Sequence, residues 1–297
     1  MKRKILAPAK INLYLEVLNK REDGYHNLRM IMQAISLYDY IEFEVVSKKD
    51  INYGGLKQIN ITSNFNYLPV DNKNLVYSII EYIFNKYNIT DKVRIFIKKT
   101  IPIGAGLGGG SSDAAAILKF LNKFYNLKLS DNELIDISLR FGSDIPFFIS
   151  SKEAICEGRG EIITKIHPYK NYHVLIATPN IRISTKEIFE KYNCGNINFN
   201  NKRSVFEGLC NAISNKNYKN LIKHLYNDLE IVTEQIVPSI KELKARIMQL
   251  GGDVAMMSGS GPTVFGIFDS YYKIMKCKAV LKNEFKEYFV YAAKPIK

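Results

Sequence analysis

The sequence predicts an α+β fold with two domains. Three observations support this: the chain has 297 residues, several segments alternate apolar and polar side chains, and a pattern of strands and helices restarts beyond about residue 160. A chain of this length can bury a substantial core in each of two domains. We place the boundary between residues 165 and 166, so residues 1–165 form the first domain and residues 166–297 the second.

The first strand is predicted in residues 9–17, AKINLYLEV. Apolar and polar side chains alternate there with the period of a half-buried strand, so Lys10 and Asn12 share one face. The loop NKREDGYHN follows it. The next predicted elements are a strand at 28–46 with a turn near Tyr38 and Asp39, a short strand within 52–69, a helix at 74–88 capped by Asn72 or Asn74, and a strand at 93–99.

Later elements follow from the same periodicities. After a glycine-rich loop we predict helices at 111–126 and 130–142, the second opened by the capping-box spacing Ser130 to Glu133 and ended by Gly142. Beyond residue 160 the predicted strands are 172–179, 253–259, 262–268 and 287–295. Helices are predicted after Ser184, over 238–251 and between the last two strands.

The composition is that of a folded protein, with 46% hydrophobic and 24% charged residues, and the formal net charge is +13. Lysine accounts for 33 of the 42 basic residues. Scattered lysines often reflect a composition bias, whereas arginine is the usual reader of bases and phosphate edges. The alternative is a positive field that attracts polyanions such as nucleotides. No basic block long enough for a nucleic-acid-binding tail is present.

The cysteines and the N-terminus bear on location. The four cysteines are far apart and form no C-x-x-C pair; they are Cys156, Cys194, Cys210 and Cys277. This spacing predicts free thiols in a reducing cytosol. Lys10, Asn12 and Glu16 interrupt any signal-peptide core, and no segment approaches the roughly 20 apolar residues of a membrane span. We therefore expect a cytoplasmic protein without a membrane partner.

Residues 101–116, IPIGAGLGGGSSDAAA, place five glycines in seven positions before a predicted helix. Glycine allows positive φ and lets an anion approach the backbone amides closely. The N–H groups and positive dipole end of the following helix add to the attraction for phosphate. Ser111 and Ser112 would add hydroxyl donors or metal ligands. The alternative is a turn that binds nothing.

Two common phosphate loops are disfavoured. Gly104, Gly106 and Gly109 satisfy the dinucleotide fingerprint G-x-G-x-x-G, but the acidic residue expected about 20 residues later falls in a predicted capped helix. The Walker A sequence requires a lysine that this loop lacks. A lysine that contacts phosphates would therefore come from elsewhere in the chain.

Five motifs resemble, in the same order, those of the GHMP kinases, small-molecule kinases whose glycine loop wraps the triphosphate of ATP. They are APAKINLYLEV at 7–17, REDGYHNL at 21–28, PIGAGLGGGSSDAAA at 102–116, FGSDIPFF at 141–148 and MMSGSGPTVFG at 256–266. Their combination resembles the branch that phosphorylates the 2-hydroxyl of a cytidylated methylerythritol in the non-mevalonate isoprenoid pathway. The resemblance implies an N-terminal α/β domain, like domain 2 of ribosomal protein S5, and a ferredoxin-like C-terminal domain.

The resemblance also implies roles for single residues. Lys10 and Asp144 would be the catalytic pair, with Asp144 accepting or orienting the hydroxyl proton. Tyr25 would stack on the cytosine, His26 would hydrogen bond to it, and Phe189 would be the opposing ring. The implied substrate-binding residues are Asn12, Tyr25, His26, Thr185 and Phe189. The implied ATP-binding residues are Asn74, Lys99, Pro102, Ile103, Gly104, Ala105, Gly106, Leu107, Gly108, Gly109, Gly110, Ser111 and Ser112.

ATP and Mg²⁺ are the expected cofactors, and a cytidine diphosphate derivative is the expected substrate. Mg²⁺ usually keeps several waters, so a dedicated carboxylate site is not expected. Two alternatives stay open: another GHMP kinase, of the homoserine or mevalonate type, or a basic RNA-binding module without catalysis. Read alone, Asp144 would be a helix cap and Lys10 a solvated edge charge. We expect a monomer or homodimer without a nucleic-acid partner.

Overall fold

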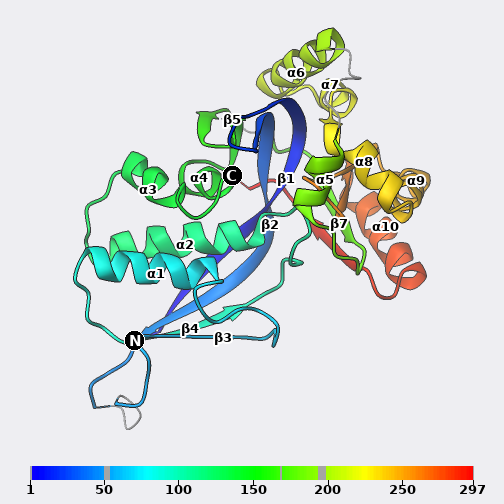
Figure 1. Ribbon diagram of the computed structural model, residues 1–297. Coiled ribbons are helices and arrows are strands. Elements are labelled where there is room, and N and C mark those ends of the chain that lie inside the picture. The colour runs from blue at the N-terminus through cyan, green and yellow to red at the C-terminus, as the bar shows by residue number, and fades with distance from the viewer. Residues whose placement is uncertain (1, 50–53, 168, 193–198, 297) are drawn as a thin grey trace. The chain divides into compact units, whose positions relative to one another are not determined.

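The computed structural model describes residues 2–49, 54–167, 169–192 and 199–296 (Figure 1). The chain divides into two compact units. The first contains Met1–Ala9, Leu37–Ile103 and Gly108–Ser150, and the second contains Lys10–Ser36, Gly104–Leu107 and Ser151–Lys297. Strands β1 (Lys2–Lys20) and β2 (His26–Val45) each contribute residues to both units. The predicted domain division at residue 165 stays a prediction.

The first unit packs helices against strands. Strand β4 (Val93–Lys98) pairs antiparallel with the end of β2, and β3 (Ile59–Ser63) pairs parallel with β4. Helices α1 (Leu75–Lys86) and α2 (Gly109–Phe124) lie side by side in Figure 1 and contact each other. Phe43 of β2 packs on Phe120 and Phe124 of α2. The apolar faces that the sequence places on these elements thus form one core.

Helix ends in this unit largely follow their cap residues. Asn74 caps α1, as one of the two predicted alternatives, through a bond from the Val76 N–H to its Oδ1 at 3.0 Å. Helix α3 (Asp131–Ser138) opens with the predicted capping box between Ser130 and Glu133. It ends at Ser138, four residues before the predicted Gly142. Helix α4 (Ile145–Ser150), which the sequence did not predict, begins seven residues after the end of α3.

The turn predicted near Tyr38 and Asp39 is wrong, because β2 continues through these residues. The Asp39 side chain is fully buried and accepts the backbone N–H groups of Thr100 and Ile101 at 2.5 and 2.9 Å. An aspartate is typical of turns because it bonds to nearby backbone. Here the backbone that it bonds belongs to the segment after β4.

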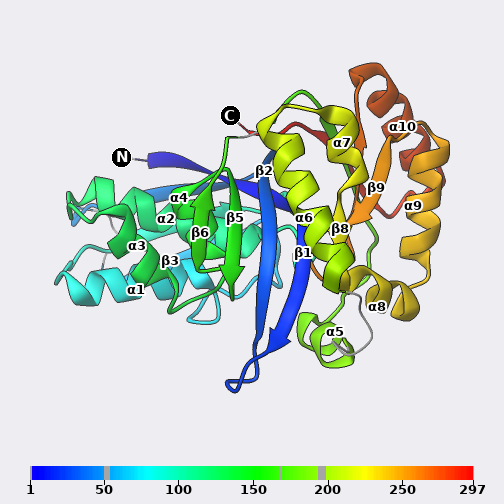
Figure 2. The same ribbon diagram turned by 90° about the horizontal axis from the view of Figure 1, so that it is seen from above.

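The second unit contains a four-stranded antiparallel sheet in the order β11–β7–β10–β9. Its strands are β7 (His173–Thr178), β9 (Val254–Met257), β10 (Val264–Phe268) and β11 (Phe289–Ala293). Helices α9 (Ser239–Gln249) and α10 (Tyr271–Glu284) pack on this sheet (Figure 2). This arrangement confirms the predicted ferredoxin-like topology.

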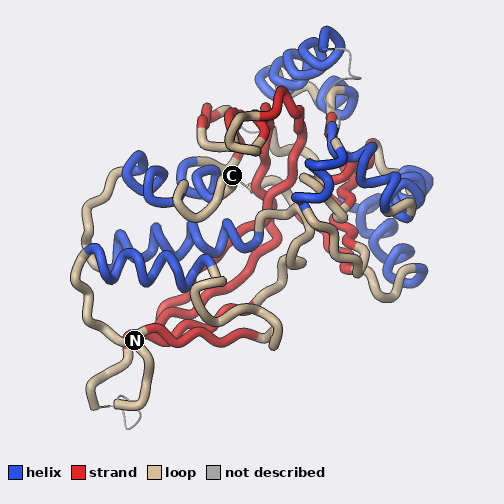
Figure 3. The backbone as a smooth tube through the Cα atoms, in the orientation of Figure 1, coloured by secondary structure: helices blue, strands red, loops and turns tan. Residues whose placement is uncertain are grey.

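Further elements of the second unit join its sheet and helices. They are β5 (Glu153–Gly158), β6 (Ile162–Lys165), α5 (Thr185–Lys191), α6 (Phe199–Ser214), α7 (Tyr218–Lys223), β8 (Tyr226–Asn227) and α8 (Asp228–Ile236), and Figure 3 separates strands from helices by colour. Strand β5 pairs with residues Leu28–Gln33 of β2 and with β6. Strand β8 pairs parallel with β1 at Tyr14 and Leu15. The sequence did not predict β5, β6 or β8.

The sequence predicts free thiols and no membrane-spanning segment. Within the described ranges, Cys156, Cys210 and Cys277 form no disulfide, and Cys194 lies outside the described residues. None of the helices in the described part of the chain combines the length and apolar composition needed to cross a bilayer.

Candidate active site

The glycine-rich loop needs glycine at two positions in particular. Gly106 has φ of +74°, and a Cβ there would collide with the carbonyl oxygen of Ser258. Ser258 also donates from Oγ to the Gly106 carbonyl at 3.0 Å. At Gly109, a Cβ would lie 3.0 Å from Ile101 Cγ2 and 3.2 Å from Lys99 Nζ. The loop is therefore packed closely by its neighbours. Gly106 has no room for a side chain, and at Gly109 the side chains of Ile101 and Lys99 would have to shift to admit one.

The loop leads into the N-terminus of α2. The N-cap is Gly108, with φ of +69°, so no side chain caps the first N–H groups. A Cβ at Gly110 would meet nothing within 4 Å, which leaves open space above this turn. Ser112 Oγ is buried and has no hydrogen-bond partner in the described chain. An uncapped helix N-terminus beside an unpartnered hydroxyl fits a phosphate group, and Ser112 is suited to a cation held with it.

The remaining loop residues differ in exposure. Ala105 and Leu107 are buried, Pro102 is half-buried, and Ile103 is exposed. The Leu107 carbonyl accepts the Lys10 backbone N–H at 2.9 Å. The buried side chains anchor the loop, so its backbone is the surface left for a ligand.

A buried ion cluster holds the two flanks of this loop. Lys99 precedes the loop and donates from Nζ to Asp39 and to Asp113, the latter at 2.7 Å and in the first turns of α2. We call Asp39, Lys99 and Asp113 the Lys99 cluster. Burial raises the pKa of Asp113 to about 7, although Lys99 acts in the opposite direction. Burial acts to lower the pKa of Lys99, but the two carboxylates outweigh it, so that pKa is raised.

Two predicted ATP-binding side chains thus have structural partners in the first unit. The Lys99 ammonium is buried in its cluster. Asn74 donates from Nδ2 to the Pro69 carbonyl at 2.7 Å while its Oδ1 caps α1. Their contact with ATP stays a prediction. The sequence did not predict the roles of Asp39 and Asp113, although Asp113 stands out as the single acid among the alanines of SSDAAA.

The predicted face of β1 is confirmed in the second unit. Lys10 donates from Nζ to Asn12 Oδ1 at 2.6 Å, and both side chains are buried. A Cβ at Gly259 would lie 3.5 Å from Lys10 Nζ, so the ammonium is beside the SGSGP segment. Asn227 fixes that segment by donating to the carbonyls of Met257 and Gly259 at 2.8 and 2.9 Å. A buried lysine held in this way presents a positive charge at a defined position.

Asp144 belongs to the first unit and directly precedes α4. Ile145 and Pro146, which follow it, are buried, whereas Asp144 itself is half-buried. Asp144 therefore stands at the start of a helix, which is the position that a helix cap would occupy. Its pairing with Lys10 in catalysis stays a prediction.

The predicted base-binding residues lie in the second unit. The rings of His26 and Phe189 are stacked, with centroids 5.1 Å apart and planes inclined by 27°. Burial, and then the nearby charge of Lys20, lower the pKa of His26, so its imidazole is neutral at pH 7. A neutral imidazole has one donor and one acceptor for a ligand. Thr185, at the start of α5, shares a hydrogen bond with Ser260 Oγ at 2.8 Å.

Tyr25 is 54% exposed and lies under the guanidinium of Arg159, whose Cζ is 3.9 Å from the ring centroid. The sequence did not predict a role for Arg159. Its position depends on the pairing of β5 with β2, which the sequence pattern does not reveal.

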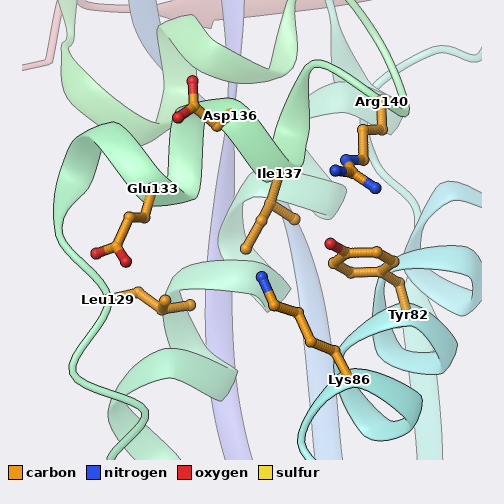
Figure 4. Close-up of a pocket in the computed structure, with 7 residues that line it drawn as sticks. All are labelled: Tyr82, Lys86, Leu129, Glu133, Asp136, Ile137 and Arg140. Carbon is orange, nitrogen blue, oxygen red and sulfur yellow. The ribbon is translucent and has the colours of Figure 1, made fainter.

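A separate pocket of about 150 Å³ lies between α1 and α3 in the first unit (Figure 4). Figure 4 shows the Tyr82 ring between the cationic side chains of Lys86 and Arg140. Among its lining residues none was predicted to bind ATP or substrate. The pocket therefore shares no lining residue with the candidate active site.

The chain is similar to known proteins along its whole length. Residues 74–152 match the family described as the GHMP kinases N terminal domain, and residues 206–287 match GHMP kinases C terminal. The 4-diphosphocytidyl-2-C-methyl-D-erythritol kinase of Clostridium perfringens is 40% identical over 293 residues, covering 99% of this chain and 98% of that protein. The Clostridium beijerinckii protein of the same name is 38% identical over 287 residues, covering 97% and 98%.

Solved structures show the same fold. The crystal structure of a 4-(cytidine 5'-diphospho)-2C-methyl-D-erythritol kinase superposes with a TM-score of 0.79 at 28% identity, covering 99% of this chain and 98% of that one. A homoserine kinase from Cytophaga hutchinsonii has a TM-score of 0.76 at 17% identity, covering 99% and 95%. The homoserine kinase supports the fold alone.

Proposed function

This chain belongs to the GHMP kinases, and from that membership we propose that it phosphorylates the 2-hydroxyl of 4-diphosphocytidyl-2-C-methyl-D-erythritol with ATP, giving the 2-phosphate and ADP. The observation that carries the proposal is the 40% identity with a kinase of that name over 99% of this chain. The reaction belongs to the non-mevalonate isoprenoid pathway.

The loop and the start of α2 support binding of the phosphate donor. ATP supplies the phosphoryl group, and Mg²⁺ offsets the charge of its phosphates. The N–H groups after Gly108 are free of side-chain caps. Ser111 and Ser112 would hold the phosphates together with Mg²⁺. Phosphoryl transfer asks the protein mainly for positioning and charge balance. Close packing of Ser258 on Gly106 fixes the position of the bare loop backbone there.

Lys10 and Asp144 handle the charges at the reacting hydroxyl. Asp144 accepts or orients the proton of the 2-hydroxyl, so that the oxygen becomes a better nucleophile. Lys10, buried and bonded to Asn12, offsets the negative charge that spreads over the transferred group. Asn12 thereby orients Lys10 and contacts the substrate.

The cytidine end of the substrate is recognised by the second unit. His26 is neutral and stacked on Phe189, so it can hydrogen bond to the cytosine edge. Tyr25 exposes an aromatic face on which a base can stack. Thr185 supplies a hydroxyl beside the SGSGP segment. A substrate without an aromatic base, such as homoserine, has no group that could stack on these rings.

The proposal extends to organisation and location. Residues 1–165 form the ATP-binding domain and residues 166–297 the ferredoxin-like domain. The protein acts in the cytoplasm as a monomer or homodimer. Despite its excess of lysine, it does not bind nucleic acid. Size-exclusion chromatography with light scattering measures the oligomeric state.

The test is a coupled assay of ADP release with purified protein, Mg²⁺, ATP and the cytidylated methylerythritol. We expect turnover that requires both Mg²⁺ and the cytidylated substrate. Homoserine and mevalonate, each at the same concentration, are the matched controls. Turnover of either control without turnover of the cytidylated substrate would overturn the substrate assignment.

A further inference from the structure

The pairing of β2 with β5 brings two turns together in the second unit. Leu28, at the start of β2, lies opposite Gly158 at the end of β5. Arg159, which follows Gly158, therefore lies beside the loop that carries Tyr25 and precedes β2. Arg159 reaches across that edge, and its Cζ lies 3.9 Å from the centroid of the Tyr25 ring. A guanidinium at this distance is stacked on the ring and attracted by its face.

The loop that carries Tyr25 is fixed by its own hydrogen bonds. The Arg21 backbone N–H donates to the Tyr25 carbonyl at 2.7 Å, and the Tyr25 N–H donates to Asp23 Oδ1 at 3.1 Å. Gly24 takes φ of +83°, which closes the turn. Arg21 Nε in turn donates to both carboxylate oxygens of Asp23. The backbone under the tyrosine ring is thus set before any ligand binds.

The turn that carries Arg159 is fixed as well. The Arg159 N–H donates to Glu161 Oε2 at 2.5 Å, and the Gly160 N–H donates to the Glu157 carbonyl at 3.1 Å. Gly158 has φ of +72°, a backbone conformation that favours glycine. The guanidinium therefore starts from a defined backbone. Its Nε is buried and lacks a hydrogen-bond partner in the described chain, while the guanidinium stacks on Tyr25 and attracts the Asp23 carboxylate of the same loop.

The stack determines where a base can bind. One face of the Tyr25 ring is covered by Arg159, and the tyrosine is still 54% exposed. The His26 and Phe189 centroids are 5.1 Å apart, a single aromatic spacing, so no base fits between those two rings. The uncovered face of Tyr25 is a platform on which a base can stack.

We propose that Arg159 is a positioning residue that holds the Tyr25 ring so that its uncovered face stacks on the cytosine of the nucleotide substrate. The inference rests on the proposed function and names the residue that sets base affinity within it. Arg159 acts through Tyr25 and does not touch the base. Its removal leaves the loop in place but frees the ring to rotate, which weakens stacking on the base.

The experiment compares Arg159→Met and Arg159→Lys with a matched control, Arg140→Met. Arg140 also stacks on a tyrosine, with Cζ 5.3 Å from the Tyr82 centroid, but in the first unit at the separate pocket. We expect Arg159→Met to raise the KM for the cytidylated substrate about fivefold to tenfold, the range that loss of one cation–π contact predicts. The KM for ATP, kcat and the melting temperature stay at wild-type values. Arg159→Lys keeps the charge without the planar stack and gives an intermediate KM.

A double-mutant cycle tests whether Arg159 changes the KM for the cytidylated substrate through Tyr25. In a Tyr25→Ala background, Arg159→Met should change the KM no further, because the ring through which it acts is absent. Calorimetric titration should show equal loss of affinity for cytidine and for CDP. An unchanged KM in Arg159→Met, an additive effect in the Tyr25→Ala background, or a loss for CDP alone would each overturn the inference. If the wild-type protein does not phosphorylate the cytidylated substrate, the proposed function fails, whereas cytidine titration still tests the platform.

Discussion

Lys10 and Asp144 are charged side chains that the fold places beside well-packed backbone. Lys10 sits on β1 with its N–H bonded to Leu107 and its ammonium bonded to Asn12. Asp144 directly precedes the buried turn of α4. A structural role and a catalytic role are both compatible with such positions, and an isosteric substitution separates them.

Asp144→Asn keeps the size of the side chain and removes its charge and proton-accepting ability. We expect kcat to fall by a factor of ~10² to 10⁴, the usual scale for a group that handles a proton. The melting temperature and the KM for ATP should change little. Steady-state ADP release and thermal denaturation measure these quantities. Near wild-type kcat would leave Asp144 with a structural role only.

Period-two alternation in AKINLYLEV placed Lys10 and Asn12 on one face, and their hydrogen bond confirms it. Nothing in the local pattern around Arg159 could do the same. Its contact with Tyr25 depends on a strand pairing between residues far apart in sequence, and side-chain periodicity specifies a face without naming a partner strand.

At the scale of elements, the Lys99 cluster connects β2, the segment after β4, and α2. Asp39 bonds the backbone of Thr100 and Ile101, and Lys99 joins it to Asp113 in α2. The two flanks of the glycine loop are thereby held by one buried ammonium. The sequence pattern does not reveal this cluster, because an aspartate at position 39 resembles a turn residue and its partners lie about 60 residues away.

Lys99→Met removes the ammonium and leaves two buried carboxylates facing each other. Breaking a buried ion pair in this way destabilises a protein by about 3–5 kcal/mol. We expect a lower melting temperature and a KM for ATP raised about tenfold or more, because the loop flanks separate. Lys98→Met, at the exposed neighbouring position, is the control. Unchanged ATP affinity in Lys99→Met would show that the cluster stabilises the unit without positioning the loop.

At the scale of the whole molecule, motifs predicted the family and the C-terminal topology. The ferredoxin-like order β11–β7–β10–β9 agrees with the four strands predicted beyond residue 160. The two compact units were harder to foresee. Strands β1 and β2 each contribute to both units, and a strand pattern does not show where along its length a strand changes neighbours.

Glu153 makes the stability of the molecule depend on pH. Its side chain is almost fully buried. Burial raises its pKa from 4.5 to about 8, although the Tyr169 backbone and Lys170 act in the opposite direction. The folded protein therefore binds this proton more tightly than the unfolded chain. The free energy of unfolding falls as pH rises from about 4.5 to about 8 and stays lower above that.

Glu153→Gln removes the ionisable group and keeps its shape. We expect the variant to melt several degrees higher than wild type at pH 8.5 and at a similar temperature at pH 5, as followed by thermal denaturation. The exposed Glu81→Gln is the control and should show no such pH dependence. Equal melting temperatures of wild type and Glu153→Gln at pH 8.5 would contradict the raised pKa of Glu153.

The interleaving of the two units has a consequence for synthesis on the ribosome. The first unit ends at Ser150, so all its segments have been synthesised when translation is about half complete. The second unit begins with Lys10–Ser36 but includes contacts such as the Val17 N–H to Asp228, 211 residues later. The first part of β1, up to Ala9, can fold with the first unit as soon as that unit has been synthesised. The second part, from Lys10, can fold only after most of the chain has been synthesised. Non-local pairings of this kind fold slowly, so the strand that carries Lys10 and Asn12 becomes ordered late.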